Sequence, residues 1–346
     1  MIASAKSMKW FLSRMVFVLL LSGICLPLAC CVAPKGGQVR SRVWPPGPNP
    51  ARIVWTGAAR APQDLEITPG FWEGIWRRVA GDQQEGLSRP YGVHADCRQR
   101  ILVVDPLKKG VHLFDRDQKR YYFIGGGGPF RHPIGVTEDE DNVAYVTDAA
   151  AGAVYRFNLG ERVPTPFVEG LKRPTGIVYN PRNKLIYVTD TLAGEVVGYD
   201  RKGKEALRFG RIGSGKGEFN LPTDLAVDTE GRIYVTDPLN ARIQIFTSAG
   251  GYLKQFGEAG DTPGYFGKAK GIAVNSEGHI YVCDAMYDRI QVFDFQGRLL
   301  LTFGTTGSGQ GEFWMPSGIA IDKDDNIYIA DTFNNRIQLL GYVWLD

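Results

Sequence analysis

The chain has 346 residues, of which 44% are hydrophobic and 22% charged, and these proportions are ordinary for a globular protein. Its formal net charge of +3 comes from the N-terminus, because 37 basic residues stand beside 37 acidic ones once the first 30 residues are set aside. A neutral body argues against nucleic-acid binding, which normally uses a strongly basic surface, so no nucleic-acid partner is expected. The 43 glycines indicate many turns.

The N-terminus has the pattern of an export signal. Three basic residues precede an apolar stretch over residues 15–28, which is shorter than the roughly 20 residues of a membrane-spanning helix. An uncleaved anchor is the alternative. The sequence up to Cys30 resembles a bacterial lipoprotein box, in which the cysteine after a small residue is lipidated, although the two residues before Ala29 depart from the pattern. We therefore predict a signal over 1–30 with Cys30 lipidated, and Cys31 is the alternative site.

The segment 31–51 is rich in proline and glycine and predicts an extended tether. A tether after a lipidated cysteine holds a domain clear of the membrane. The expected location is thus the bacterial cell envelope, on the periplasmic or the surface side of a membrane. Cys97 and Cys283 lie in different repeats, so no disulfide between them is expected.

Two short elements are predicted before the repeats. Residues 52–56 form a strand that can complete the last repeat and so join the two ends of the chain. Within residues 64–80 the apolar side chains have helical spacing, which predicts a short amphipathic helix packed on the ring, or alternatively in contact with lipid.

A short strand motif ending in aspartate recurs six times from about residue 87 onward. Successive aspartates are 42 to 47 residues apart, and in five repeats a proline stands 15 or 16 residues upstream. The aspartates, which we call the anchor aspartates, are Asp105, Asp148, Asp190, Asp237, Asp284 and Asp331. Such a period is typical of propeller blades.

Each repeat reads as four short strands. In the fourth repeat these are residues 225–227, 232–236, 242–246 and 252–256, with glycine-rich turns between them. Six such units predict an all-β, six-bladed β-propeller over residues 52–346, which we expect to be a monomeric ring because closure removes the exposed sheet edges.

The repeats resemble the NHL-repeat family, most clearly over residues 316–322, 326–331 and 334–338. The resemblance covers about residues 87–346, and the whole chain looks like the bacterial six-bladed NHL propellers that carry a lipoprotein signal. The eponymous Asn-His-Leu is absent. What the resemblance implies is a scaffold for protein, peptide or RNA contacts, with a few enzymatic relatives.

Several motifs that suggest chemistry have a structural explanation. The glycine-rich loop 211–217 lacks the Ser/Thr of a phosphate loop and recurs near residue 307, so it is interpreted as a turn. The acidic segments 138–142 and 322–326 fit tight turns better than calcium loops. The anchor aspartates suggest a repeated structural hydrogen bond, and Arg242, Arg289 and Arg336 stand where they can pair with them.

Enzymatic propeller relatives hold a metal in the central channel. The four histidines, His94, His112, His132 and His279, occupy different repeat positions, so we expect no shared metal, cofactor or catalytic set. We therefore predict a binding scaffold for a protein or peptide, tethered to the membrane by lipid. The alternative is a propeller hydrolase or lyase with a channel metal.

Two sets of residues are the candidates for binding, and both are expected on one face of the ring. The residue before the repeat proline position is a cation in four blades: Arg89, His132, Arg173 and Lys268. Asp224 stands at the position that Gly92, Gly135, Gly176 and Gly318 hold in other repeats, and it can offset part of this charge. The second set follows the anchor aspartates by two positions: Leu107, Leu192, Leu239, Met286 and Phe333. The alternatives are scattered solvated cations for the first set and inter-blade packing for the second.

Overall fold

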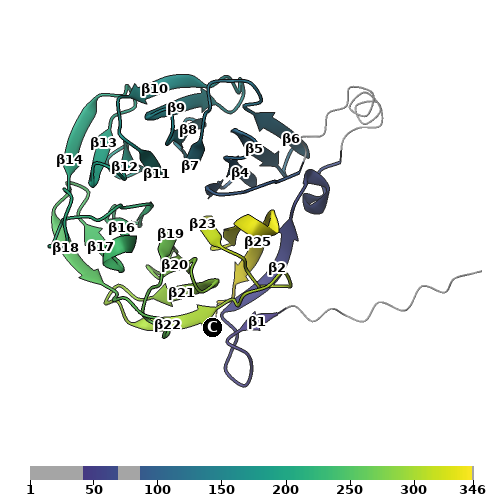
Figure 1. Cartoon of the computed structure of the whole chain (residues 1–346). Coiled ribbons are helices and arrows are strands. Elements are labelled where there is room, and N and C mark those ends of the chain that lie inside the picture. Colours follow the sequence, from purple (N-terminus) through teal and green to yellow (C-terminus); the bar gives the residue numbers. More distant parts are fainter. Residues whose placement is uncertain (1–41, 69–85, 345–346) are drawn as a thin grey trace, which may run out of the picture. The chain divides into compact units, whose positions relative to one another are not determined.

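The computed structural model describes residues 42–68 and 86–344, which form a ring of six antiparallel sheets (Figure 1). Each sheet is one predicted repeat, so the six-bladed propeller is confirmed. The predicted signal over 1–30, most of the predicted tether and most of the predicted helix over 64–80 lie outside the described residues. Among the described residues, no helix is long and apolar enough to cross a membrane.

The strands run outward from the centre of the ring in chain order. Blades one and two consist of β3 (Val93–Ala95), β4 (Arg100–Asp105), β5 (Gly110–Asp115), β6 (Arg120–Ile124), β7 (Pro133–Glu138), β8 (Val143–Asp148), β9 (Ala153–Asn158) and β10 (Thr165–Glu169). Blades three and four consist of β11 (Pro174–Asn180), β12 (Leu185–Asp190), β13 (Glu195–Tyr199), β14 (Glu205–Phe209), β15 (Leu225–Val227), β16 (Ile233–Asp237), β17 (Arg242–Phe246) and β18 (Tyr252–Phe256). Blade five consists of β19 (Ala269–Val274), β20 (Ile280–Asp284), β21 (Arg289–Phe293) and β22 (Leu299–Phe303).

The sixth blade is closed by the N-terminal part of the described chain. Its strands β23 (Pro316–Ile321), β24 (Ile327–Asp331) and β25 (Arg336–Tyr342) are followed in space by β2 (Ile53–Ala59) and β1 (Val43–Trp44). In the antiparallel register of β2 with β25, Ile53 lies opposite Tyr342 and Ala59 opposite Ile337. The predicted closing strand at 52–56 is thus present, and it is longer than the sequence indicated.

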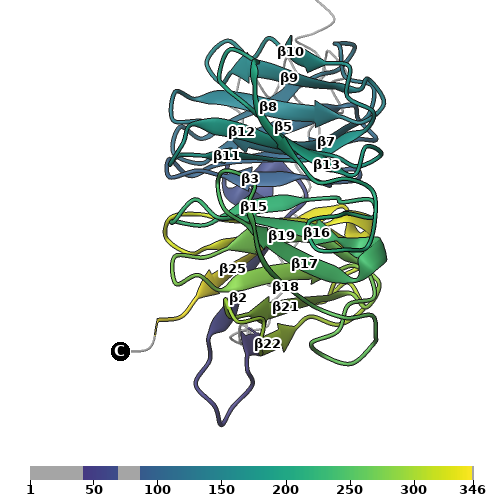
Figure 2. The same cartoon turned by 90° about the vertical axis from the view of Figure 1, so that its left-hand side faces the viewer.

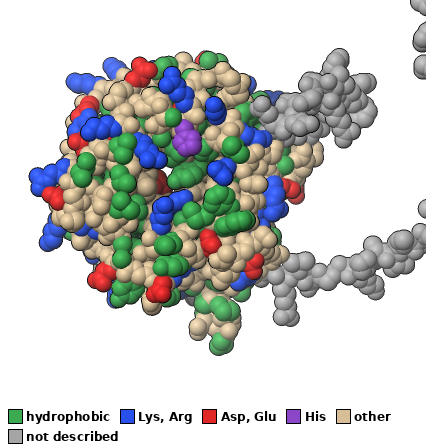
Figure 3. Space-filling model, in the orientation of Figure 1, with side chains coloured by type: hydrophobic (Ala, Val, Ile, Leu, Met, Phe, Trp, Pro, Cys, Tyr) green, Lys and Arg blue, Asp and Glu red, His purple; other side chains and the backbone are tan. Residues whose placement is uncertain are grey.

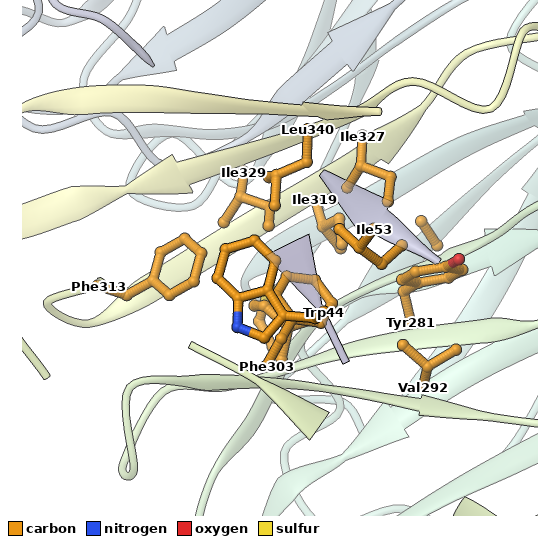
Figure 4. Close-up of a cluster of buried hydrophobic side chains, with 13 residues drawn as sticks. Trp44, Ile53, Tyr281, Val292, Phe303, Phe313, Ile319, Ile327, Ile329 and Leu340 are labelled. Carbon is orange, nitrogen blue, oxygen red and sulfur yellow. The ribbon is translucent and has the colours of Figure 1, made fainter. Parts of the chain in front are cut away.

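The boundary predicted for the tether was wrong at its C-terminal end. The proline content of residues 42–51 predicts a spacer, yet Val43 and Trp44 pair with β2 and make blade six five-stranded. Trp44 is 7% exposed, and its ring lies 5.4 Å from that of Phe303 between centroids. Figure 4 shows this indole among the apolar side chains that join blades five and six. Burial of the Trp44 side chain therefore fixes this segment against blade six, although its proline content is typical of an extended spacer.

The ring has two faces with different loops. On the face that points toward the viewer in Figure 1, which we call the front face, lie the loops that follow the second strand of each blade, including the 3-10 turns η2 (Pro238–Asn240) and η3 (Thr332–Asn334). Figure 2 shows these loops along its right-hand edge. A further 3-10 turn, η1 (Pro62–Leu65), follows β2 and buries Leu65 against the ring. The first-to-second-strand turns lie on the opposite, back face.

Candidate functional site: the front face and the central channel

The anchor aspartates hold the front face together. Asp105 accepts hydrogen bonds from the backbone amides of Ser88 and Arg89, at 2.7 and 3.0 Å, and from that of Leu107 at 3.1 Å. The Asp105 carboxylate therefore ties the loop entering its blade to the loop that follows its second strand. Equivalent bonds occur in the other blades, for instance from Lys268 to Asp284 at 2.9 Å. The repeated structural role predicted for these aspartates is confirmed, and both candidate sets of residues are brought to one face.

In three blades an arginine completes this clamp. The guanidinium groups of Arg242, Arg289 and Arg336 lie 2.8, 3.0 and 2.7 Å from the anchor carboxylates of their own blades. Arg242 also donates to the backbone carbonyls of Ser214 and Gly215, both at 2.8 Å. The glycine-rich loop 211–217 is thus held in place by the buried Arg242 guanidinium, which confirms its interpretation as a repeat turn.

Five apolar side chains project from the loops after the second strands, and we call them the apolar crown. Their exposed fractions lie between 40% and 63%, although side chains of this size are usually buried. The members are Leu107, Leu192, Leu239, Met286 and Phe333. Exposure of this degree argues against the alternative that they seal neighbouring blades. The ring of Trp314, itself 55% exposed, lies 5.6 Å from that of Phe333 and extends the crown.

The predicted cations lie beside the apolar crown. Arg89, His132, Arg173 and Lys268 are all exposed. The guanidinium carbon of Arg89 lies 5.1 Å above the ring of Phe333, so the two candidate sets meet across the junction of blades one and six. Figure 3 shows this face, where hydrophobic side chains and Lys and Arg side chains gather around a hollow at the middle of the ring. Apolar and cationic groups therefore share one surface.

The central channel is lined by the innermost strands and encloses a cavity of about 200 Å³. At its front end, glycines let the inner strands approach closely. A Cβ atom on Gly92 would lie 2.3 Å from the carbonyl oxygen of Ile134, and one on Gly318 would lie 2.3 Å from that of Tyr91. The blade-four member of this row is Asp224, whose side chain lines the channel at this constriction. Only this blade therefore places a carboxyl group there.

The environment of Asp224 changes its ionisation. Its Oδ2 accepts a hydrogen bond from the amide of Ile272 at 3.3 Å, and burial raises the pKa of the carboxyl to about 7. Close by, burial lowers the pKa of Lys270 to about 8, and burial together with the Asp224 charge raises the pKa of Tyr91 to about 12. Lys270 and Tyr91 were missed by the sequence analysis. Both follow the repeat proline position by one residue, which is the signal that could have found them.

The back end of the channel holds a second polar group. His94 and Glu138 line the cavity there, and Glu138 lies 2.6 Å from the guanidinium of Arg100. Burial outweighs this cation and raises the pKa of Glu138 to about 7, while it lowers that of His94 to about 4. The other oxygen of Glu138 is buried without a hydrogen-bond partner among the described residues.

The remaining chemical candidates have structural roles. The acidic turns cap themselves: Asp322 accepts amide hydrogen bonds from Asp324 and Asn326, both at 2.9 Å, and the Tyr328 hydroxyl at 3.0 Å. His112 is buried beside the hydroxyl of Tyr121. Within the described ranges, no group of three or more His, Cys, Asp or Glu residues is placed to hold a metal. Cys97 and Cys283 are both free thiols.

Two family models match parts of the chain. One is described as the SMP-30/Gluconolactonase/LRE-like region and matches residues 133–260. The other is described as a 6-bladed beta-propeller and matches residues 227–300 and 276–342. The six observed blades and these matches agree with the resemblance found in the repeats: the chain is a six-bladed β-propeller, and residues 133–260 are similar to the SMP-30/Gluconolactonase/LRE-like region.

Several solved structures have a similar fold. Virginiamycin B lyase from Staphylococcus aureus is 15% identical, with a TM-score of 0.56, over 74% of this chain and 96% of its own. A gluconolactonase from Xanthomonas campestris is 16% identical, with a TM-score of 0.59, over 74% and 87%. An auxiliary nutrient binding protein from Bacteroides thetaiotaomicron is 18% identical, with a TM-score of 0.61, over 75% and 71%. At these identities the likeness concerns the fold, which hosts both enzymes and binding proteins.

Proposed function

We propose that this protein is a membrane-tethered binding platform of the bacterial envelope, whose front face docks a protein or peptide carrying apolar and acidic side chains. The observation that carries the proposal is the apolar crown, five large side chains that remain 40–63% exposed on one face. Contiguous exposed apolar surface in a soluble domain commonly marks an interaction site.

The charge on the same face defines the chemistry of the partner. Arg89, His132, Arg173 and Lys268 are exposed there, whereas the anchor aspartates nearby are buried and already engaged by backbone amides. The cations are thus not neutralised by those carboxylates. A partner with acidic residues complements this surface, speeds its own association through electrostatic steering, and leaves the apolar crown to supply the area that is removed from water.

Truncation of the apolar crown tests the proposal. The variant combines Leu192→Ala, Leu239→Ala and Phe333→Ala and serves as bait for solubilised envelope proteins. We expect a protein retained by the wild-type chain to be lost, while the melting temperature stays within about 2 °C, because exposed side chains contribute little to folding. A matched control removes Leu253, Leu299 and Leu300, which are 37–49% exposed on the outermost strands. Retention by the truncated bait, or a large fall in its melting temperature, contradicts the docking role.

The tether is proposed from the sequence. Cys30 follows the apolar signal stretch, so mass spectrometry of the mature N-terminus is expected to find acyl chains on this residue. An unmodified residue 30 in protein extracted from membranes contradicts lipidation there, and acylation of Cys31 selects the alternative site.

A second candidate function is a hydrolase or lyase that works in the channel with a bound metal. The observation in its favour is the presence of Asp224, Glu138 and His94 along one cavity, each with a shifted pKa, since such shifts gather at active sites. Elemental analysis of the purified protein separates the two functions: stoichiometric, tightly held calcium or zinc favours the enzyme.

A further inference from the structure

The front mouth of the channel is bordered by one residue from each blade, the one that follows the repeat proline position. These residues are Tyr91, Ile134, Thr175, Thr223, Lys270 and Ser317. The threonine and serine hydroxyl groups are occupied by the scaffold: Thr175 bonds to Thr191 at 2.7 Å, Thr223 to Thr236 at 3.0 Å, and Ser317 to Thr332 at 2.7 Å. Lys270 and Tyr91 are the members left to meet a ligand.

Lys270 crosses the mouth of the channel. It belongs to blade five, yet its Nζ lies 5.1 Å from the centroid of the Tyr91 ring at the start of blade one, with blade six between them. No hydrogen bond or ion pair of this ammonium occurs among the described residues. The group is partly buried, and burial and the neighbouring Lys268 together lower its pKa to about 8. A desolvated cation without a counter-ion favours an anion in its vicinity.

Asp224 lies at the constriction, close to Tyr91, and the Cys283 thiol lies near both Asp224 and Lys270. Its Oδ2 accepts the Ile272 amide of blade five, and its Oδ1 lies 2.9 Å from the place where a Cβ on Gly176 of blade three would stand. The carboxyl therefore spans the gap between two blades. With a pKa of about 7 it carries a proton in slightly acidic solution and can then donate a hydrogen bond.

We propose that Lys270, Tyr91 and Asp224 form a binding site for a carboxylate group at the front mouth of the channel. The Lys270 ammonium pairs with the anion, the Tyr91 ring walls the site, and the protonated Asp224 carboxyl donates to a ligand oxygen. A carboxylate fits better than phosphate, because one lysine supplies one charge and a dianion next to Asp224 is repelled once that group ionises. The carboxylate can belong to a small acid or to the end of a peptide.

The site has a defined pH dependence. The charged groups that face it are Lys268 beside Lys270 and Arg173 beside Tyr91, and the buried thiol of Cys283 lies close to both Asp224 and Lys270. Burial raises the pKa of that thiol well above its usual value, so it stays neutral. As pH rises from 6 to 8.5, Asp224 gains a negative charge and Lys270 loses its positive charge. Both changes weaken binding of an anion that is itself ionised throughout.

The test is a titration of the whole mature chain whose lysines carry ¹³C-methyl groups, a modification that keeps the positive charge. The probes are acetate, succinate, inorganic phosphate, and a short neutral peptide with either a free or an amidated C-terminus. We expect the Lys270 signal to shift saturably with each carboxylate at pH 6. At pH 8.5 the carboxylates are expected to bind about tenfold more weakly, since a pKa that shifts by one unit on binding corresponds to a tenfold difference in affinity between the two protonation states. At pH 8.5, where phosphate is a dianion and Asp224 is ionised, phosphate is expected to cause no saturable shift, and the amidated peptide is expected to cause none at either pH.

Lys254 is the matched internal control, because its Nζ also lies over an aromatic ring, 4.8 Å from that of Phe295, but away from the channel. Its signal is expected to stay unchanged. In Lys270→Met, ligand-observed binding of acetate is expected to disappear, and in Asp224→Asn much of the pH dependence is expected to disappear. Absence of a saturable Lys270 shift in the wild-type chain, an equal shift of Lys254, or equal binding by Lys270→Met overturns the site. The site does not rest on the docking proposal, since acetate needs no contact with the apolar crown.

Discussion

Replacement of Asp331 by alanine is expected to lower the free energy of unfolding by about 3–5 kcal/mol, the usual cost of breaking a buried ion pair. Asp331 is fully buried and accepts hydrogen bonds from the Trp314 amide at 2.8 Å, the Asn334 side chain at 2.9 Å and the Arg336 guanidinium at 2.7 Å. Arg336 is only 4% exposed. Removal of the Asp331 carboxylate leaves the Arg336 guanidinium without its counter-ion inside blade six. Urea denaturation measures the loss in the free energy of unfolding.

The repeat supplies a matched comparison in blade two. Asp148 holds the same position and accepts backbone amides, including that of Arg131 at 2.6 Å, but five residues later the chain has Ala153 and no arginine. Asp148→Ala is therefore expected to lower the free energy of unfolding by less, about 1–3 kcal/mol. It leaves backbone amides without an acceptor, but it leaves no buried cation without a counter-ion. Equal losses in the two variants would show that the Arg336 ion pair adds nothing to the clamp.

Replacement of Trp44 by alanine is the other change with a large expected effect. We expect a loss of about 3–5 kcal/mol, typical of the removal of a buried tryptophan. The indole is 7% exposed and packs on Phe303 and on the glycine at position 311, where a Cβ would lie within van der Waals overlap of the ring. Loss of the side chain opens the outer edge of blade six, where the two ends of the ring are joined.

The matched control for this variant is Trp344, which lies at the other end of the described chain and is 54% exposed. Trp344→Ala is expected to change stability by less than about 0.5 kcal/mol. The two variants are compared by thermal and urea denaturation. A Trp44→Ala protein as stable as the Trp344→Ala protein would mean that residues 42–51 are a spacer after all.

Most of the fold could be predicted because each blade repeats one local pattern. The apolar strand before every anchor aspartate and the 15- or 16-residue interval from the proline position locate the first two strands of each blade. In repeat four, the predicted strands at 242–246 and 252–256 coincide with β17 and β18. Strand β1 could not be found in this way, because it is two residues long and stands outside the repeat, within a proline-rich segment.

The candidate site was predictable in its placement and not in its exposure. Equivalent positions of a closed ring must share a face, which located both Arg89 and Phe333. An apolar residue in a loop can pack against the next blade or face solvent, and only the backbone path decides between them. The role of Lys270 could not be predicted for the same reason. Its side chain contacts Tyr91, two blades away, and no local sequence pattern encodes such a contact.

Photo-crosslinking in intact cells tests the central claim, that the front face is the surface that binds a partner. A photoreactive amino acid is placed at Leu192 or Phe333 on the front face, and at Glu230 or Lys323 in exposed turns of the back face. The account predicts an adduct with the same protein or peptide from both front positions and none from either back position. Adducts from the back positions alone, or equally from both faces, would contradict it.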